Sequence, residues 1–359
     1  MSYHRHLVLL PPNRVWRTYR GGRTLDALAG APAPADSSFP EDWVASTTRA
    51  VNIGRESIQE GISQVQINGQ HYDLARLVAQ DPVYFLGAAH LARWGPDLRL
   101  LVKLLDSSIR LHFQVHPTAA FARQFLGSAS GKTEAYHVLA TRPEVADPCI
   151  YLGFQRPPDR DTLRRLIESQ DIAGIEACFD RVPVQPGDTY LVPGGVPHAL
   201  GEGVFLVEIQ EPSDLVVRFE FERGGYLLPE SARFMSRGLE FCLDIFDLTA
   251  RPLPEVMQRQ RCRPRLEQTL GPASREERLI GPAETPCFGV TKLFLRDAVV
   301  RDVTTASILI VTEGEVTLRT AGGSHRLRRY DKVLLPAGLG RLELTPEPRA
   351  ELLACHPPS

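Results

Sequence analysis

The chain has 359 residues, of which 43% are hydrophobic and 23% are charged, and its formal net charge is −2. This length and apolar content suffice for more than one buried core, so we expect about two folded domains. The charge is close to neutral and the sequence has no dense run of Lys and Arg among aromatic residues, which argues against a nucleic-acid partner.

The cysteines and the amino terminus indicate the cellular setting. The six cysteines are scattered, and no Cys-x-x-Cys motif suggests a thiolate metal site or a redox pair. The first apolar run ends at Pro11, too early for a secretion signal or a membrane span. We therefore expect a cytoplasmic protein with reduced cysteines and no membrane partner.

Two stretches of the chain have helical spacing. In the first, residues 73–95, apolar positions recur every three or four residues until Asp81-Pro82 interrupts them. In the second, residues 161–180, a break is expected between Asp171 and Gly174. We interpret the second stretch as an inserted pair of helices outside the functional site.

Most of the remaining chain is typical of short strands. From Leu98 onward, runs of Val, Ile, Leu and Phe are separated by Gly and Pro. Expected strands include 111–115, 135–139, 189–192, 204–209, 216–221, 289–295, 306–311, 315–318 and 332–335, with Glu313-Gly314-Glu315 as a turn. The Pro-rich and Arg-rich stretch 249–286 predicts a connection between a first domain, 1–248, and a second domain, 287–359.

Three clusters in the first domain carry potential metal ligands. Strand alternation places His112, Gln114 and His116 on one face. Glu134 heads an expected strand after a glycine-rich loop, and His198 ends a run of glycine and proline turns. A histidine on a strand face is more often structural, so the prediction rests on the conjunction of the three clusters. Together they provide the nitrogen, oxygen and carboxylate ligands that suit zinc.

These clusters resemble the class I phosphomannose isomerases of the cupin superfamily. That family carries Gln-Val-His-Pro, a Lys-x-Glu turn and Pro-x-Gly-x2-His-Ala, which occur here in the same order at 114–117, 132–134 and 193–199. The resemblance implies a mainly β fold with α additions: two cupin (jelly-roll) domains plus an inserted helical element. It also implies one zinc ion per chain, held by Gln114, His116, Glu134 and His198.

The resemblance further implies a reaction, the interconversion of mannose 6-phosphate and fructose 6-phosphate through an enediol. Arg218, Lys132 and Asp214 would line the reaction site. Arg218 could bind the enediolate or the phosphate of the sugar phosphate, although an ion pair on the strand surface is the plainer reading. The general base stays open among Lys132, Asp214 and a water or hydroxide on the metal.

Some residues depart from the family pattern, and they leave the choice of sugar open. Gly131 stands where some members have His, His112 adds an imidazole, and the surroundings of Arg218 are more apolar than in close relatives. In the second domain, Tyr330 to Arg341 repeats the turn motif with Arg341 in the place of the histidine. We therefore expect a second, degenerate cupin domain without metal.

Four alternatives remain. A cupin oxygenase would want a redox-active iron on a His-x-His pair, and Gln114 in place of the first histidine argues against it. A non-catalytic zinc-containing sugar-binding or regulatory protein, or an isomerase of a different sugar, would keep the metal site. A purely structural protein would not need these ligand clusters.

Overall fold

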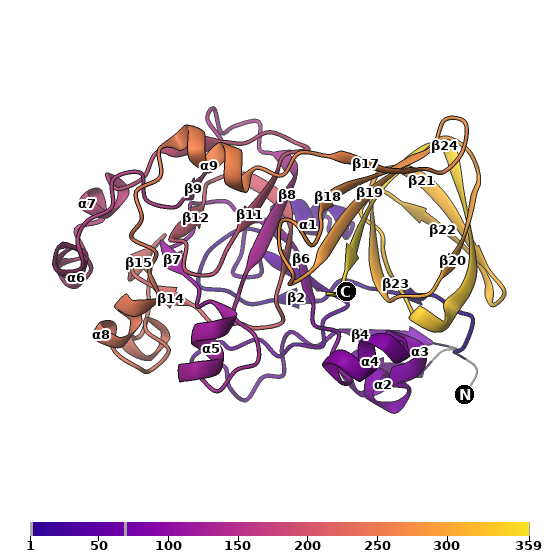
Figure 1. The fold of residues 1–359 in the computed structure, drawn as a ribbon, viewed down its shortest axis with the longest axis horizontal. Helices are drawn as coiled ribbons and strands as arrows, with labels where there is room; N and C mark the ends of the chain where they lie inside the picture. The colour runs from indigo at the N-terminus through magenta and orange to yellow at the C-terminus, as the bar shows by residue number, and fades with distance from the viewer. Residues whose placement is uncertain (1–2, 68–69, 359) are drawn as a thin grey trace.

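The computed structural model describes residues 3–67 and 70–358. Residues 1–2 and 68–69 of the expected first domain lie outside the described residues. So does residue 359, the last of the expected second domain. The mainly β fold with helical additions is confirmed. The strands that carry the predicted site lie in the left half of Figure 1, and a C-terminal barrel lies in the right half.

Two antiparallel sheets form the first half of the molecule. The β8 sheet has the order β11 (Thr189–Val192), β8 (Glu134–Thr141), β13 (Val204–Gln210), β6 (Leu101–Asp106), β3 (Glu41–Val44) and β2 (Arg14–Val15). The β7 sheet has the order β10 (Arg181–Pro183), β9 (Cys149–Leu152), β12 (His198–Leu200), β7 (Gln114–Val115) and β14 (Val217–Arg218). The strands β7 and β14 are shorter than the expected 111–115 and 216–221.

An apolar core that includes Leu105, Val138, Leu152 and Leu206 joins the two sheets. The outer face of the β7 sheet, with Phe113 and Val115 as predicted by alternation, packs in a second core with the helices α6 (Arg160–Ser169), α7 (Ile172–Glu176) and α8 (Leu239–Cys242). The break between α6 and α7 falls at Gln170 and Asp171, where the Asp171 side chain caps α7. The inward face of the β7 sheet therefore carries part of the first core together with the polar side chains of the predicted site.

The C-terminal sheet surrounds an apolar core of its own. Its strands are β17 (Arg265–Thr269), β18 (Arg275–Ile280), β19 (Gly289–Leu295), β20 (Val299–Val303), β21 (Ser307–Thr320), β22 (Gly323–Arg328), β23 (Lys332–Leu335) and β24 (Gly340–His356), joined by β1 (Val8–Leu9), which pairs with β23. Its interior holds residues such as Leu293, Val311 and Leu352. The predicted connection 249–286 contains α9 (Leu253–Gln260), β17 and β18, and the division into domains stays a prediction.

The expected turn at Glu313-Gly314-Glu315 is wrong, because β21 continues through it from Ser307 to Thr320. The pairing of β21 with β24 is irregular on either side of Gly314, which has φ +74°. A Cβ atom there would lie 2.1 Å from the carbonyl oxygen of Arg349. The glycine therefore permits a β-bulge inside a continuous strand, and the same residue pattern also occurs in turns.

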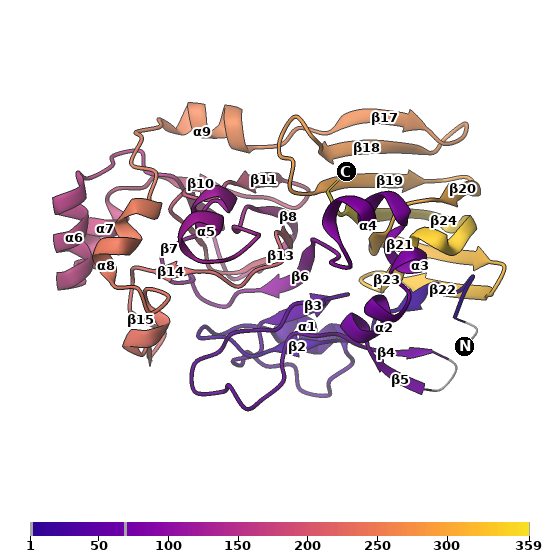
Figure 2. The ribbon, with the colours of Figure 1, turned by 60° about the horizontal axis from the view of Figure 1, so that its bottom comes forward.

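The outer face of the β8 sheet is buried against the C-terminal barrel. One shared core contains Val102, Phe205 and Ile209 of the first sheet together with Ile308 and Leu353 of the barrel. Figure 2 shows the helices α2 (Leu74–Gln80), α3 (Pro82–Leu86) and α4 (Ala88–Trp94) beside this junction. The site is thus built on strands that are covered on both faces.

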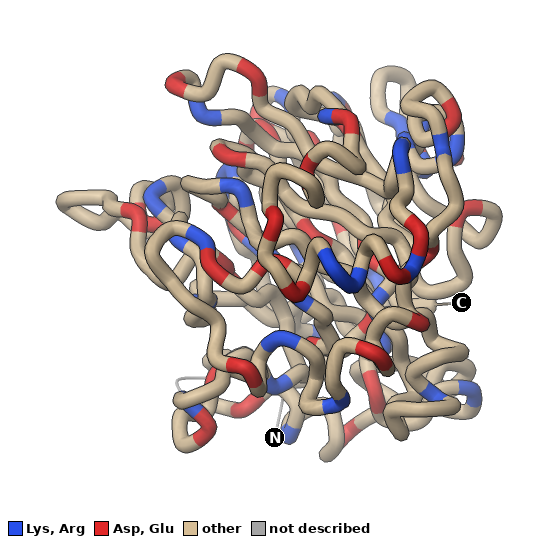
Figure 3. Tube along the Cα trace, turned by 90° about the vertical axis from the view of Figure 1, so that its left-hand side faces the viewer, with Lys and Arg blue, Asp and Glu red and all other residues tan. Residues whose placement is uncertain are grey.

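The remaining elements are α1 (Arg23–Leu28), β4 (Gln64–Ile67), β5 (Gln70–Asp73), α5 (Ala119–Phe125), β15 (Glu222–Arg223), β16 (Tyr226–Leu227), η1 (Glu230–Ala232), η2 (Leu243–Ile245) and η3 (Ala337–Leu339). Among the described residues, no helix is long and apolar enough to cross a membrane. Figure 3 shows acidic and basic residues interspersed at the end of the molecule that carries α6 and α7.

Candidate metal centre and adjoining cavity

Strand register brings the predicted metal ligands together. Gln114 pairs with His198 on one neighbouring strand and with Arg218 on the other. Glu134 begins β8 and pairs with Val192 of β11. The β7 sheet therefore supplies neutral ligands, and the facing β8 sheet supplies the carboxylate.

The side chains converge closely. Nε2 of His116 lies 3.3 Å from Oε2 of Glu134, and Nε2 of His198 lies 3.2 Å from Oε1 of the same carboxylate. The possible ligand atoms of these three residues all lie within 4.8 Å of one another. The amide nitrogen of Gln114 lies 3.3 Å from Nε2 of His198. The structure thus brings all four predicted ligands together.

Backbone carbonyls fix the orientation of both imidazoles. Nδ1 of His116 lies 2.9 Å from the carbonyl oxygen of Leu215, and Nδ1 of His198 lies 2.9 Å from that of Val196. Because a carbonyl oxygen only accepts, each Nδ1 carries the hydrogen and each Nε2 presents a lone pair. Oε2 of Glu134 is buried and has no hydrogen-bond partner among the described residues. These converging, buried lone pairs fit a zinc ion.

Lys132 is in direct contact with this group. Its Nζ lies 3.0 Å from Nε2 of His116 and 3.2 Å from Oε2 of Glu134. Burial raises the pKa of Glu134, but the charge of Lys132 outweighs it and holds that pKa well below its usual value. Burial and the Lys132 charge lower the pKa of His116 to about 3. At neutral pH both side chains are therefore in the forms that bind a metal.

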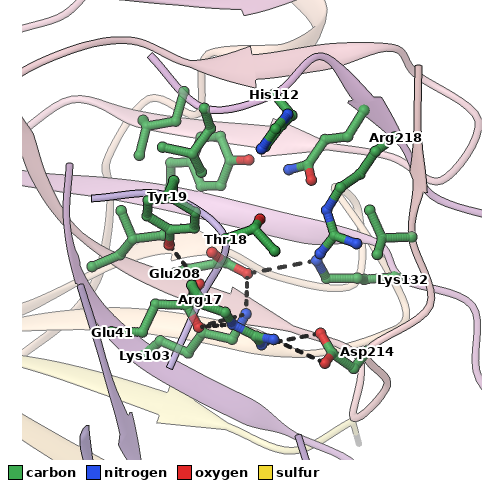
Figure 4. Close-up of a pocket in the computed structure, with 16 residues that line it drawn as sticks. Arg17, Thr18, Tyr19, Glu41, Lys103, His112, Lys132, Glu208, Asp214 and Arg218 are labelled. Atoms are coloured by element: carbon green, nitrogen blue, oxygen red, sulfur yellow. Dashed lines mark hydrogen bonds and ion pairs between the residues drawn. The ribbon is translucent and has the colours of Figure 1, made fainter. Parts of the chain in front are cut away.

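A small chamber of about 40 Å³ adjoins the metal ligands (Figure 4). Its polar lining consists of Arg17, Thr18, Tyr19, Glu41, Lys103, His112, Gln114, Lys132, Tyr136, Glu208, Asp214 and Arg218. A larger cleft of about 450 Å³ shares Thr18, Asp214, Val216 and Arg218 with the chamber. A ligand could thus place one end in the inner chamber and extend into the outer cleft.

Arg218 lies where the inner chamber meets the outer cleft. Its Nη1 donates to the carbonyl oxygen of Ala232 at 3.3 Å, and the described residues show no carboxylate paired with it. The alternative interpretation of Arg218, a surface ion pair with a carboxylate, is therefore not found among the described residues. Burial lowers the pKa of this guanidinium, although it stays a cation at neutral pH. It is suited to bind an anion that enters the cavity.

Asp214 is held by Arg17. The two terminal nitrogens of Arg17 each donate to a different oxygen of Asp214 at 3.1 Å, and the amide of Val51 donates to one of them at 2.9 Å. Burial raises the pKa of Asp214, but the charge of Arg17 outweighs it, so the pKa is lowered. A carboxylate so engaged is a weak base, and its contacts favour a positioning role.

Sequence reasoning missed a buried charge network behind the chamber. Nζ of Lys103 lies 2.8 Å from Oε1 of Glu208, and Arg17 donates to Oε2 of Glu41 at 2.9 Å. Burial raises the pKa of Glu208. Lys103 and Glu208 each interrupt an apolar strand, which was a usable signal. Nothing in the pattern around Arg17 indicated its position.

The departures from the family pattern also find places in the structure. Gly131 packs against the backbone before α5, where a Cβ atom would lie 2.4 Å from the amide nitrogen of Ala119. His112 lines the inner chamber and is 2% exposed. In the barrel, Tyr330 keeps a positive φ of 72°, and Arg341 is exposed to solvent. Arg341, which stands where the turn motif of the first domain has His198, thus faces away from the apolar barrel core.

No family model matches the chain. It is 25% identical over 264 residues to the mannose-6-phosphate isomerase ManA of Bacillus subtilis, covering 73% of this chain and 76% of the relative. It is also 25% identical over 327 residues to the mannose-6-phosphate isomerase of Streptococcus mutans, covering 90% and 89%. These relatives confirm the resemblance to phosphomannose isomerases and the expected class of enzyme, an isomerase.

Solved structures have the same fold. The mannose 6-phosphate isomerase from Bacillus subtilis superposes with a TM-score of 0.75 at 20% identity, over 98% of this chain and 99% of that chain. A mannose 6-phosphate isomerase crystallised with zinc bound superposes with a TM-score of 0.71 at 16% identity, over 98% and 100%. At this identity the likeness concerns the fold.

Proposed function

We propose that this chain is a zinc-dependent aldose–ketose isomerase that interconverts mannose 6-phosphate and fructose 6-phosphate through an enediol. The observation that carries the proposal is the convergence of His116, Glu134 and His198 beside a chamber that opens into a larger cleft. The relatives named above support the choice of substrate. The six cysteines, all free, support the expected cytoplasmic setting.

One zinc ion per chain would be held by Gln114, His116, Glu134 and His198. The nitrogen and oxygen of the Gln114 amide can exchange places by rotation of the side chain, which would turn the oxygen toward the imidazole of His198. Zinc at this position would supply a Lewis acid for the negative charge that develops on the sugar oxygens at C1 and C2.

The chamber residues would perform the proton transfer. From the aldose, a base removes the proton at C2, the hydroxyl proton of O2 passes to O1, and a proton is returned at C1, so the two carbons exchange oxidation states without an external oxidant. We assign this transfer to Lys132 and Glu208, whose Nζ and Oε1 lie 4.0 Å apart on the chamber wall. Arg218 would bind the enediolate, since its strand neighbour is the proposed ligand Gln114. Asp214 would keep its place through Arg17.

The phosphate would lie in the outer cleft. Arg49 and the hydroxyl residues Ser128, Ser213, Ser231 and Ser236 line this cleft. A guanidinium and several hydroxyls are suitable donors for phosphate oxygens. The carbon chain of the sugar would then run from the metal centre past Arg218 to the cleft.

The test is a coupled assay on zinc-loaded protein with mannose 6-phosphate, with glucose 6-phosphate and unphosphorylated mannose beside it. We expect conversion of mannose 6-phosphate to fructose 6-phosphate, and its loss after chelation. Conversion that persists in protein shown to lack metal would contradict the zinc proposal. Zinc-loaded protein that binds the sugar phosphate without converting it would instead identify a sugar-binding or regulatory protein, and conversion of another sugar only would identify a different isomerase.

Matched variants separate metal binding from chemistry. Glu134→Gln keeps the shape of the side chain but removes the charge, so we expect loss of zinc and of turnover. Glu208→Gln and Arg218→Ala should retain zinc and lower kcat by about a hundredfold or more, the usual effect of removing one charged group from a transition state. An Arg218→Ala enzyme at full rate would remove that residue from the mechanism.

A further inference from the structure

His112 is a buried imidazole that the mechanism above does not use. It is 2% exposed, and its Nδ1 lies 3.0 Å from the carbonyl oxygen of Glu220. Because that carbonyl only accepts, Nδ1 carries the hydrogen and Nε2 presents a lone pair. Nε2 is buried and makes no hydrogen bond of good geometry to the described residues, although a backbone group of Thr18 lies beside the ring.

The imidazole of His112 lies at the wall of the inner chamber. Figure 4 shows His112 and Arg218 directed into the same chamber, with Lys132 and Tyr19 among the residues around it. The other imidazoles of the site differ, because Nε2 of His116 lies near Lys132 and Glu134, and Nε2 of His198 lies near Gln114 and Glu134. Buried polar atoms are nearly always hydrogen-bonded, so an unpaired one at a cavity wall indicates a ligand group.

We propose, as an extension of the proposed function, that His112 determines sugar specificity by accepting a hydrogen bond at Nε2 from a hydroxyl of the bound sugar. A hydroxyl can donate to a lone pair, whereas a phosphate dianion has no hydrogen to donate. The phosphate therefore goes elsewhere, in agreement with its assignment to the outer cleft.

The position of His112 along the chain selects the hydroxyl. His112 lies just before β7 and precedes the proposed ligand Gln114 by two residues, which is at most about 7 Å of backbone. The oxygens at C1 and C2 belong beside the metal ligands, so His112 meets a hydroxyl farther along the carbon chain, at C3 or C4. A sugar lacking that hydroxyl would leave Nε2 unpaired, which is the condition that gives strong discrimination.

Two substitutions separate the two ring nitrogens. In His112→Asn the amide nitrogen takes the place of Nδ1 and can still donate to Glu220, but no atom replaces Nε2. In His112→Gln the longer side chain again brings a polar atom to the position of Nε2. The measurements are zinc content, melting temperature, kcat and KM with mannose 6-phosphate, and the Kd of mannitol 6-phosphate, which cannot isomerise.

For His112→Asn we expect full zinc content and a rise in KM and Kd of about two- to tenfold, the effect of one hydrogen bond, with kcat nearly unchanged. His112→Gln should recover part of the loss. With 3-deoxy or 4-deoxy mannose 6-phosphate, one analogue should bind equally well to the wild type and to His112→Asn, since the hydroxyl that makes the contact is already missing.

Two results would overturn the inference about His112 but leave the proposed function intact. In the first, the wild type converts the sugar phosphate, but KM and Kd are the same in the well-folded Asn variant. In the second, either variant loses zinc, which would place His112 in the metal site. A wild type that neither converts mannose 6-phosphate nor binds mannitol 6-phosphate would instead overturn the proposed function, and the inference with it.

Discussion

The Nζ atom of Lys132 lies 3.0 Å from Nε2 of His116 and 3.2 Å from Oε2 of Glu134, two of the atoms proposed to bind zinc. A zinc ion that binds there must overcome the repulsion of this ammonium group. We predict that Lys132→Gln raises the affinity for zinc about tenfold, since roughly 1.4 kcal/mol of repulsion is removed, while turnover falls sharply. Competition with a chelator of known affinity measures the first effect.

The control for this prediction is Lys292→Gln in the C-terminal barrel, where the lysine pairs with Glu351. It should leave zinc affinity unchanged. Weaker zinc binding in Lys132→Gln would mean that the ammonium group supports the site by positioning Glu134.

The pairing of Arg17 with Asp214 and Glu41 predicts a large effect on stability. Arg17→Met leaves two buried carboxylates without their partner, and we expect it to lower the free energy of unfolding by about 3–5 kcal/mol. The double variant Arg17→Met, Asp214→Asn should lose less than the sum of the two single variants. Denaturant unfolding of all three proteins gives the coupling.

Arg14→Met is the comparison for Arg17, because the pair of Arg14 with Asp26 is partly exposed. We expect a loss of about 1 kcal/mol or less there. Strictly additive losses at Arg17 and Asp214 would show that the two side chains do not depend on each other.

The close packing of Gly131 predicts a steric effect of substitution on the proposed metal centre. A Cβ atom at this position would lie 2.4–2.6 Å from backbone atoms of residues 117–119, which cannot move like the end of a side chain. Gly131→Ala should lower the free energy of unfolding by about 1–3 kcal/mol and weaken zinc binding, since Lys132 and Glu134 follow directly. Thermal melting with and without zinc measures both. Gly289→Ala is the control, because its added Cβ atom would meet only ordinary contacts at 3.6 Å or more.

His137 predicts a pH dependence in the zinc-free protein. Burial lowers its pKa to about 3, whereas an unfolded histidine titrates near 6.5. Below pH 6.5 the unfolded state therefore binds the extra proton, and stability is lost as the pH falls toward 3, by up to about 1.4 kcal/mol per pH unit. Unfolding at pH 7, 6 and 5 should show a shallower dependence for His137→Gln. The exposed His71, changed in the same way, should leave the slope unaltered.

The convergence of the candidate metal ligands could be predicted from the sequence because its signals are local. Alternation along 112–116 and the turn that ends at His198 place each ligand relative to its own strand, and the register of β7 with β12 then brings Gln114 and His198 together. The proposed role of each residue stays a prediction. The fold class was readable for the same reason, from short apolar runs with regular breaks.

The charge network behind the chamber could not be predicted in the same way. Arg17 and Asp214 are 197 residues apart, and their contact depends on how the amino-terminal segment joins the edge of the β8 sheet through β2. A buried charge pair has no periodic signature, and a charged side chain alone reads as exposed. The prediction of a turn at Gly314 was wrong for a related reason. The pairing with strand β24 decides whether this residue forms a turn or a bulge.

The shared core between the β8 sheet and the C-terminal barrel has a wider consequence. Val102, Phe205 and Ile209 would face water without the barrel, and the buried pair of Lys332 with Asp42 would be broken. The two halves bury apolar surface against each other as the subunits of an obligate dimer do, but they belong to one polypeptide. The amino-terminal strand β1 pairs with β23 of the barrel. Their association does not depend on protein concentration. Because none of the proposed site residues lies in the barrel, we expect its interior to tolerate substitution more readily than the face that packs against the β8 sheet.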